Sequence, residues 1–155
     1  MKYQGDLAAQ GYVKVRMAEG GTIETLWAVR VAPDEDLFRL DNSPFYAYGV
    51  SYGDIVTAVQ SAPEMYDFVA VVTRSGNRTV RLLLPDDADS EPPASKRILD
   101  GLVALGCSYE GAFSRTISMT VPSNVSLTDV AAYLVATGRE WEYADPTYDD
   151  LFPED

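Results

Sequence analysis

The order of the predicted elements in the second half of the chain most restricts the fold. A strand over residues 79–84 (TVRLLL) precedes a helix, two strands at 107–113 and 116–121, a second helix and a short strand at 141–143. This strand–helix–strand–strand–helix–strand order is that of the split β-α-β unit, which is ferredoxin-like in plan. It predicts two helices packed on one face of a four-stranded antiparallel sheet.

The two helices are predicted from apolar spacing and from their end signals. The second helix has apolar residues at offsets 0, 3, 4, 7 and 8, which lie on one helical face. These residues are Leu127, Val130, Ala131, Leu134 and Val135. Ser126 is the predicted N-cap, with Asp129 as the acid of a capping box, and Gly138 ends the helix. By the same argument the first helix has Ser95 as its N-cap and ends at Gly106.

The first half of the chain is predicted to be a small β-structure. Apolar and polar residues alternate over 12–17, and residues 22–31 are rich in β-branched side chains. Shorter strands follow at 37–40 and 55–60, separated by tight turns. Closely spaced strands of this kind favour a strongly bent sheet or a partial barrel. Trp27, in the second strand, is predicted to be a core residue.

The fold prediction is therefore an α+β chain with an N-terminal bent β-sheet or partial barrel followed by a ferredoxin-like unit. Its 155 residues suit one ordinary domain or two small ones that share a core. We expect an N-terminal β-rich subdomain over residues 1–78, a ferredoxin-like α+β subdomain over 79–146 and an acidic tail over 147–155. The tail contains Tyr148 and Phe152 and has an apolar patch for docking, but the favoured prediction is a solvated end.

The balance of charge restricts the partners. The chain has 24 acidic and 12 basic residues, a formal net charge of −12. Such a field repels nucleic-acid phosphates and anionic membranes and accelerates encounter with a basic protein. RNA binding on a ferredoxin-like sheet also needs aromatic side chains on the central strands, and these strands have none. We therefore predict no nucleic acid and no membrane as partner, although an acidic surface can also serve solubility alone.

The absence of histidine excludes several chemistries. Ser–His–Asp and Cys–His catalysis are not available to a chain with no histidine. With Cys107 as the single cysteine, a zinc site of nitrogen and sulfur ligands and an internal disulfide are excluded as well. No cofactor is expected. The start of the sequence lacks a basic-then-apolar leader, and no long apolar run follows, so the predicted location is cytoplasmic.

The segment over residues 38–60, FRLDNSPFYAYGVSYGDIVTAVQ, is the densest aromatic stretch. Asp41 and Asp54 lie on turns at either side of its tyrosines, and paired carboxylates are what glycoside hydrolysis uses. The simpler interpretation is that each aspartate bonds the backbone of its own turn. The aromatic side chains either form a binding face or fill a core with few aliphatics. Core filling is favoured, with Tyr48 and Tyr52 the best candidates for exposure.

A second acidic feature is the proline-rich loop over residues 85–93 (PDDADSEPP), which is long enough to be mobile. No acidic cluster has the spacing of a calcium loop. The candidate partner- or ligand-binding residues are Asp41, Asn42, Tyr48, Tyr52, Asp54, Asp86, Asp87 and Asp89. No catalytic, cofactor-binding or metal-binding residue is predicted.

Several segments together resemble a known bacterial family. They are ETLWAVRV, FRLDNSPFYAYGVSYGDIVTA, SGNRTVRLLL, and a late TVP followed by a helix and WEY. The chain is similar over about Glu24 to Tyr143 to the family known as domain of unknown function 4265, and DNSPFY…GVSYGD is the specific part. The acidic loop and the acidic tail depart from the family. The resemblance implies no reaction, cofactor or catalytic residue, but small families of this kind often resemble immunity proteins.

Two functions follow as hypotheses. The first is a non-enzymatic acidic binding protein, such as an immunity or inhibitor protein that neutralises a basic bacterial toxin by direct docking. The alternative is a small-ligand-binding or carboxylate-based enzyme domain that works in a cleft between the two units. A pocket lined by Asp41, Asp54 and tyrosines favours the alternative, and a flat acidic face favours the first.

Overall fold

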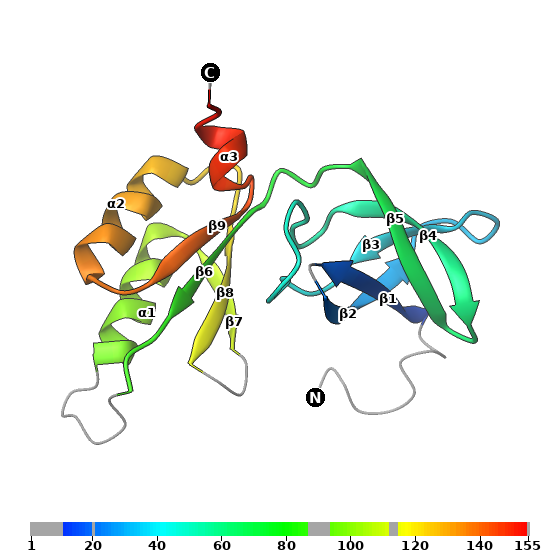
Figure 1. The fold of residues 1–155 in the computed structure, drawn as a ribbon, viewed down its shortest axis with the longest axis horizontal. Coiled ribbons are helices and arrows are strands. Elements are labelled where there is room, and N and C mark those ends of the chain that lie inside the picture. Colours follow the sequence, from blue (N-terminus) through cyan, green and yellow to red (C-terminus); the bar gives the residue numbers. More distant parts are fainter. Residues whose placement is uncertain (1–10, 20, 87–93, 112–114, 155) are drawn as a thin grey trace.

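The computed structural model describes residues 11–19, 21–86, 94–111 and 115–154. The chain is a mixed α+β protein whose strands form two separate sheets that lie side by side (Figure 1). The coarse prediction of an α+β chain with a bent N-terminal sheet is confirmed. None of the helices in these residues is long and apolar enough to cross a lipid bilayer.

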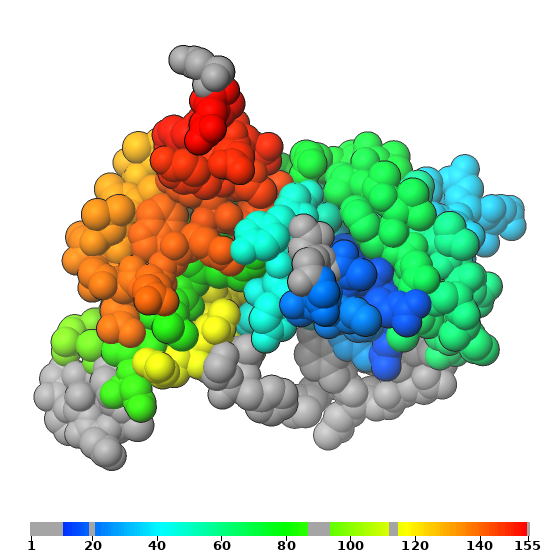
Figure 2. Space-filling view, viewed as in Figure 1, coloured from blue at the N-terminus to red at the C-terminus, as the bar shows by residue number. Residues whose placement is uncertain are grey.

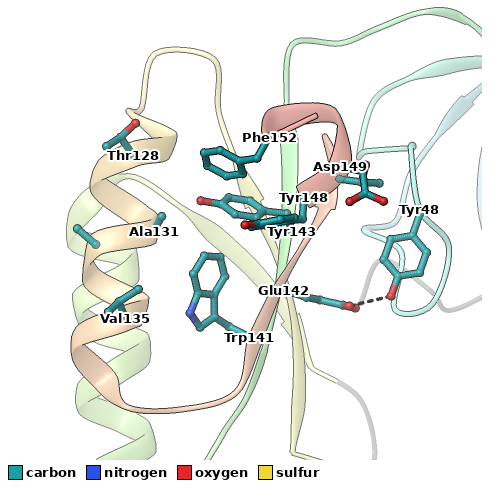
Figure 3. A pocket seen from close by; sticks show the side chains of 12 residues that line it. Tyr48, Thr128, Ala131, Val135, Trp141, Glu142, Tyr143, Tyr148, Asp149 and Phe152 are labelled. Carbon is teal, nitrogen blue, oxygen red and sulfur yellow. Dashed lines mark hydrogen bonds between the residues drawn. The ribbon is translucent and has the colours of Figure 1, made fainter. Parts of the chain in front are cut away.

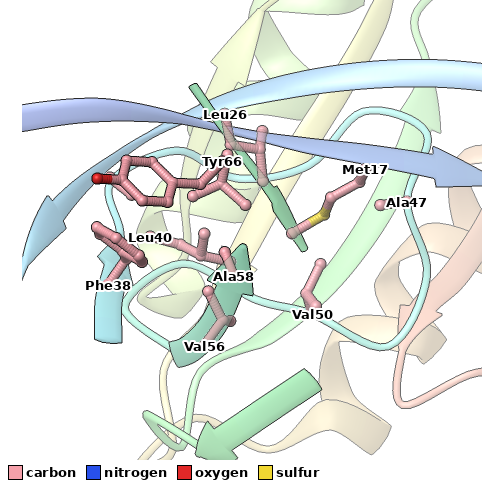
Figure 4. Packing of buried hydrophobic residues seen from close by; sticks show 11 residues of the cluster. Met17, Leu26, Phe38, Leu40, Ala47, Val50, Val56, Ala58 and Tyr66 are labelled. Atoms are coloured by element: carbon pink, nitrogen blue, oxygen red, sulfur yellow. The ribbon is translucent and has the colours of Figure 1, made fainter. Parts of the chain in front are cut away.

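The first sheet contains five strands that curl around a hydrophobic core. They are β1 Tyr12–Glu19, β2 Thr22–Arg30, β3 Leu37–Leu40, β4 Ile55–Ala62 and β5 Met65–Thr73. Successive strands pair antiparallel, and β5 returns to pair in parallel with β1, which closes the ring of hydrogen-bonded strands. Figure 4 shows the interior, where Phe38 and Tyr66 pack among Val, Leu, Ala and Met side chains.

The predicted core position of Trp27 is wrong. Leu26 and Ala28 point into the ring with 3% and 0% exposure, so Trp27, one residue away, faces outward and is half-buried. Its ring is covered on that side by Lys14, whose Nζ lies 5.2 Å from the ring centroid. The narrow interior already holds the rings of Phe38 and Tyr66, and the smaller side chains of Leu26 and Ala28 fill the space beside them.

The second sheet carries the helices. Its strands, in spatial order, are β7 Ser108–Gly111, β8 Thr116–Val121, β6 Arg78–Leu83 and β9 Trp141–Asp145, all antiparallel to their neighbours. Helices α1 (Ala94–Leu105) and α2 (Leu127–Thr137) lie on one face (Figure 1). Strand alternation explains this layer, because Val80 and Leu82 join the core beneath the helices while Thr79 and Arg81 point to the first sheet.

The helix ends test the capping predictions. Ser126 accepts a hydrogen bond from the backbone N–H of Asp129, and Gly138 adopts a left-handed φ of 70°, as predicted for α2. Gly106 likewise follows the end of α1 with a φ of 107°. Ser95 is not an N-cap, because α1 already begins at Ala94 and Ser95 lies in its first turn.

The tail is ordered and contacts the second sheet, although most of its described residues are exposed to solvent, so the end is solvated but not frayed. A short helix, α3 (Tyr148–Leu151), begins with a capping box in which Thr147 and Asp150 bond each other's backbone N–H groups. Beyond α3, the ring of Phe152 lies 6.3 Å from that of Tyr143 on β9. The aromatic residue Phe152 thus holds the tail against β9, although the tail is rich in acidic residues.

Candidate functional site

The central segment (residues 41–54), which links β3 to β4, lies between the two sheets. In Figure 2 it is the cyan surface between the blue-green first unit and the orange second unit. Hydroxyl pairs fasten it to the second sheet: the Oγ atoms of Ser43 and Ser118 are 2.6 Å apart, and Ser51 Oγ is 2.7 Å from Thr79 Oγ1. All four residues are buried. The segment is therefore a polar joint between the two units.

The aspartates of the central segment bond within this joint. The Asp54 side chain is buried, and its two oxygens accept hydrogen bonds from the backbone N–H groups of Ser51 (2.9 Å) and Ser75 (2.8 Å). Asp41 accepts a hydrogen bond from the hydroxyl of Tyr52 at 3.3 Å. The Ser51 contact fits the simpler interpretation for Asp54, because a carboxylate held by a backbone donor of its own turn stabilises that turn. The Asp41 contact is instead with the side chain of Tyr52, so it does not bear on that interpretation.

Asn42 bridges both units. Its Oδ1 accepts the backbone N–H of Trp27 on β2 at 2.7 Å, and its Nδ2 donates to Glu110 Oε1 on β7 at 3.2 Å. The carboxylate of Glu110 also accepts the backbone N–H of Ser43. An amide that donates and accepts at once can satisfy both sheets, which a smaller or charged side chain cannot do.

Arg81 of β6 is the cation of the joint. The side chain is almost fully buried, and its Nη1 donates to the carbonyl oxygens of Ala47 (2.8 Å) and Pro44 (3.3 Å). Its Nε donates to Glu142 Oε1 at 2.8 Å, and the guanidinium lies 4.6 Å from the ring centroid of Tyr48. The planar fork of arginine suits this set of acceptors, which lie in several directions.

The tyrosines of the central segment do not fill a core, so that prediction is wrong, while the exposure expected of Tyr48 and Tyr52 is confirmed. Tyr46, Tyr48 and Tyr52 are 57%, 41% and 38% exposed. The segment buries its backbone and its small residues, including Ala47 and Val50, and directs the larger rings outward. Its carbonyl oxygens accept hydrogen bonds from Arg81 and from hydroxyls, and the backbone N–H groups of residues 45–47 donate to the carboxylate of Glu24. These backbone groups therefore do not need the rings to cover them.

Asp145 carries the main pH-sensitive charge of the joint. Its Oδ2 accepts a hydrogen bond from Ser51 at 2.6 Å, and Arg74 donates to Oδ1 at 3.2 Å. Burial raises the pKa of Asp145 above its usual value of 3.8, opposed by the Ser51 hydrogen bond and by the charge of Arg74, while the nearby charge of Asp54 raises this pKa further. The contribution of Asp145 to the free energy of unfolding is therefore fully present when the pH is below the pKa of this side chain in the unfolded chain. It is lost as the pH rises through the pKa of Asp145 in the folded protein.

We expect Asp145→Asn to become progressively more stable relative to wild type as pH rises from about 4 to 7, because the amide does not ionise. Urea unfolding at several pH values measures the difference. Asp100→Asn, which removes an exposed carboxylate on α1, should leave the pH profile of wild type unchanged. A difference that is constant over this range, or that falls, contradicts the raised pKa.

An aromatic groove lies between α2, β9 and α3. It has a volume of about 1010 Å³. Figure 3 shows the rings of β9 and α3 facing the small side chains of α2. The groove is lined by Tyr48, Thr128, Ala131, Ala132, Val135, Trp141, Glu142, Tyr143, Thr147, Tyr148, Asp149 and Phe152. The groove exists because β9 is at the edge of its sheet, and α2 covers only part of the face of β9 that points to the helices.

The rings of the groove form a continuous wall. Trp141 and Tyr143 are two residues apart on β9, so they share a face, and their rings meet edge to face with centroids 4.8 Å apart. Tyr148 and Phe152 are one helical turn apart and their centroids are 4.9 Å apart. The opposite wall consists of Ala131, Ala132 and Val135, so the groove accepts an apolar body between rings and small side chains.

Tyr48 connects the groove to the joint. Its hydroxyl donates to Glu142 Oε2 at 2.7 Å, while the other carboxylate oxygen of Glu142 bonds Arg81. The hydrogen bond to Glu142, with burial and the charge of that carboxylate, raises the pKa of Tyr48 above its usual value of 10.0, against the opposing effect of Arg81. The phenol therefore stays a hydrogen-bond donor at neutral pH.

The structure separates the predicted site residues. Tyr48 alone of them lines the groove, Asp41, Asn42, Tyr52 and Asp54 lie in the central segment, and Asp86 is exposed after β6. Asp87 and Asp89 lie outside the described residues. Sequence reasoning missed the pair Trp141 and Tyr143 on β9, although their spacing of two residues was a visible signal. It noted Tyr148 and Phe152 as an apolar patch but did not count them among the site residues.

The groove combines aromatic, small apolar and acidic side chains. Among the residues that the structure describes, no three His, Cys, Asp or Glu side chains gather to hold a metal ion. The thiol of Cys107 is buried below α1, and burial raises its pKa, which disfavours the reactive thiolate. The groove supplies ring faces, small apolar side chains and carboxylates, which together recognise shape and charge.

The fold and the groove thus define a two-sheet α+β protein with an aromatic surface site. The chain belongs to the family described as Domain of unknown function (DUF4265), whose model matches residues 24–143. None of the curated proteins compared with the chain matches it. A crystal structure of a hypothetical protein from Neisseria gonorrhoeae is similar with a TM-score of 0.67 at 17% identity, over 88% of this chain and 96% of that one. This likeness concerns the fold alone.

Proposed function

We propose that this chain is a non-enzymatic binding protein that docks a segment of a basic protein partner into the aromatic groove. The observation that carries the proposal is the groove itself, a cavity of about 1010 Å³ whose described lining contains five exposed or half-buried rings, two carboxylates and no lysine or arginine. Exposed aromatic side chains in a concave site are typical anchors of protein interfaces. The net charge of −12 favours encounter with a basic partner.

The alternative of a small-ligand-binding or carboxylate-based enzyme domain has less support, because neither Asp41 nor Asp54 is among the residues that line the groove. Asp54 is buried with both oxygens bonded to backbone N–H groups, and both oxygens of Glu142 are bonded by Arg81 and Tyr48. A general acid or base must present a lone pair or a proton to its substrate. These carboxylates instead organise the joint and one wall of the groove.

The proposal extends to an immunity or inhibitor role, in which the bound partner is a basic bacterial toxin that docking neutralises. Its support is the combination of an apolar site with an acidic chain, which suits recognition of a basic protein. For the second unit we propose a ferredoxin-like arrangement. The strand order β7-β8-β6-β9, with two helices on one face, supports this assignment.

The test is capture of a partner from the lysate of the source cells by wild type and by a variant with a blocked groove. Val135→Arg places a long cation in the groove from an exposed position on α2. Val103→Arg is the matched control, since Val103 is also exposed, lies on α1 and is not among the lining residues. We expect wild type and Val103→Arg to retain one basic protein that is released as salt rises, and Val135→Arg to lose at least about tenfold in affinity.

Equal capture by Val135→Arg and Val103→Arg overturns the assignment of the groove. Capture of no protein at low salt overturns the basic-partner proposal as a whole. A partner that the groove variant loses but that salt does not release is bound by apolar contact, which contradicts the basic-partner part of the proposal only.

A further inference from the structure

The two carboxylates that line the groove, Glu142 and Asp149, differ in whether other side chains bond them. Glu142 is neutralised, because Arg81 and Tyr48 bond its two oxygens. Asp149, at the first turn of α3, has no hydrogen bond or ion pair with any residue in the described part of the chain. No lysine or arginine is among the described lining residues. The groove therefore has one uncompensated negative charge beside its rings.

The rings next to Asp149 present their surfaces to solvent. Tyr148 and Phe152 are 62% and 53% exposed, and their planes are tilted by 42°. Figure 3 shows the carboxylate of Asp149 on the Tyr48 side of this pair. A cation is attracted to the face of an aromatic ring, and this attraction grows when the cation leaves water. Ring faces and a carboxylate side by side are thus complementary to a positive group on an apolar stem.

We propose that the anchor of the bound partner is a lysine or arginine side chain. Its apolar stem lies along Tyr148 and Phe152, and its charged end reaches the carboxylate of Asp149. This inference rests on the proposed function of the groove and states which residue type the groove selects. Long basic side chains cover apolar surface with their methylene stems while the charge stays near polar groups, which is the arrangement that this wall offers.

Other occupants fit the same wall less well. A purely aliphatic side chain buries the carboxylate of Asp149 without a partner, and an unpaired buried charge is costly. An acidic segment or a phosphate adds repulsion from Asp149 and from the net charge of −12. The preference for a basic anchor is therefore a matter of specificity as well as of affinity.

The experiment compares two probes that differ in one charged group. N-acetyl-Phe-Lys-amide and N-acetyl-Phe-norleucine-amide have the same phenyl group and a side-chain stem of similar length, but only the first has the ammonium. Each is titrated into the ¹⁵N-labelled full chain, and the shifts of the groove amides give the affinity. We expect the lysine probe to bind about fivefold to tenfold more tightly than the norleucine probe.

Two variants locate the charge that is responsible. Asp149→Asn should reduce the preference for the lysine probe to within about twofold, since it removes the charge and keeps the shape. Glu154→Gln is the control, because it removes an exposed carboxylate near the tail that is not among the lining residues, and it should leave the preference intact. Equal loss in both variants means that the general acidic field causes the preference, and this overturns the role of Asp149.

The outcomes separate this inference from the proposed function. If the norleucine probe binds the groove as tightly as the lysine probe, the basic anchor is wrong while the groove remains a binding site. If neither probe shifts the groove amides up to its solubility limit, the peptide-binding groove and the anchor are both overturned. In that case, capture of a partner from the lysate by wild type shows that another surface of the protein binds the partner.

Discussion

Replacement of Arg81 by alanine is expected to lower the free energy of unfolding by about 3–4 kcal/mol. The guanidinium is buried between the two units and donates to the carbonyl oxygens of Pro44 and Ala47 and to the carboxylate of Glu142. Alanine leaves these acceptors without a donor in a site that little water reaches. The free-energy cost of leaving a buried polar group without a hydrogen bond exceeds the net contribution of that hydrogen bond to stability. Urea unfolding followed by circular dichroism measures the loss.

Two further variants show whether the geometry of the guanidinium matters. Arg81→Lys keeps the charge but not the planar fork, so it should recover only part of the loss. Arg39→Ala, which removes an exposed arginine of β3, should change the stability by less than about 0.5 kcal/mol. A loss below about 1 kcal/mol for Arg81→Ala means that the joint does not depend on this side chain.

Replacement of Phe38 by alanine is expected to lower the free energy of unfolding by about 3–5 kcal/mol. Phe38 has 0% exposure at the centre of the first sheet, where its ring centroid lies 4.5 Å from that of Tyr66. The guanidinium of Arg30 lies 4.8 Å from the same ring, so alanine removes a cation contact as well as apolar area. Thermal and urea unfolding both report the change.

The matched control for Phe38 is leucine. Phe38→Leu keeps most of the volume and should cost less than about 1.5 kcal/mol, because it leaves a small cavity in place of a large one. If alanine and leucine are equally destabilising, the ring contacts with Tyr66 and Arg30 matter more than the filled volume. If alanine costs less than about 1 kcal/mol, the interior of the first sheet collapses around the missing ring.

Local signals explain why much of the second unit is predictable. The caps of α2 at Ser126 and Gly138 were both predicted, because a serine before an apolar stripe and a glycine after it act through their own backbone. Strand β8 has the bounds predicted for it, since its residues alternate between the helix layer and the joint. Ser95 failed as a cap because α1 begins at Ala94 and places Ser95 inside its first turn.

The faces of the first sheet were not predictable in the same way. Both faces of β2 are apolar, with Leu26 and Ala28 on one and Trp27 and Val29 on the other. Only the narrow ring of five strands decides that the smaller pair is inside. The same competition explains the tyrosines of the central segment, because their pattern fits a core and a surface equally.

The sequence by itself determined the mixed α+β class, the order of elements in the second unit and the family to which the chain belongs. It also excluded histidine-based chemistry, since that depends on composition alone. Only the tertiary structure decided that the central segment is a joint and that the rings of β9 and α3 share a groove. These features join residues far apart in the chain, such as Tyr48 and Glu142, and no local period encodes such a contact.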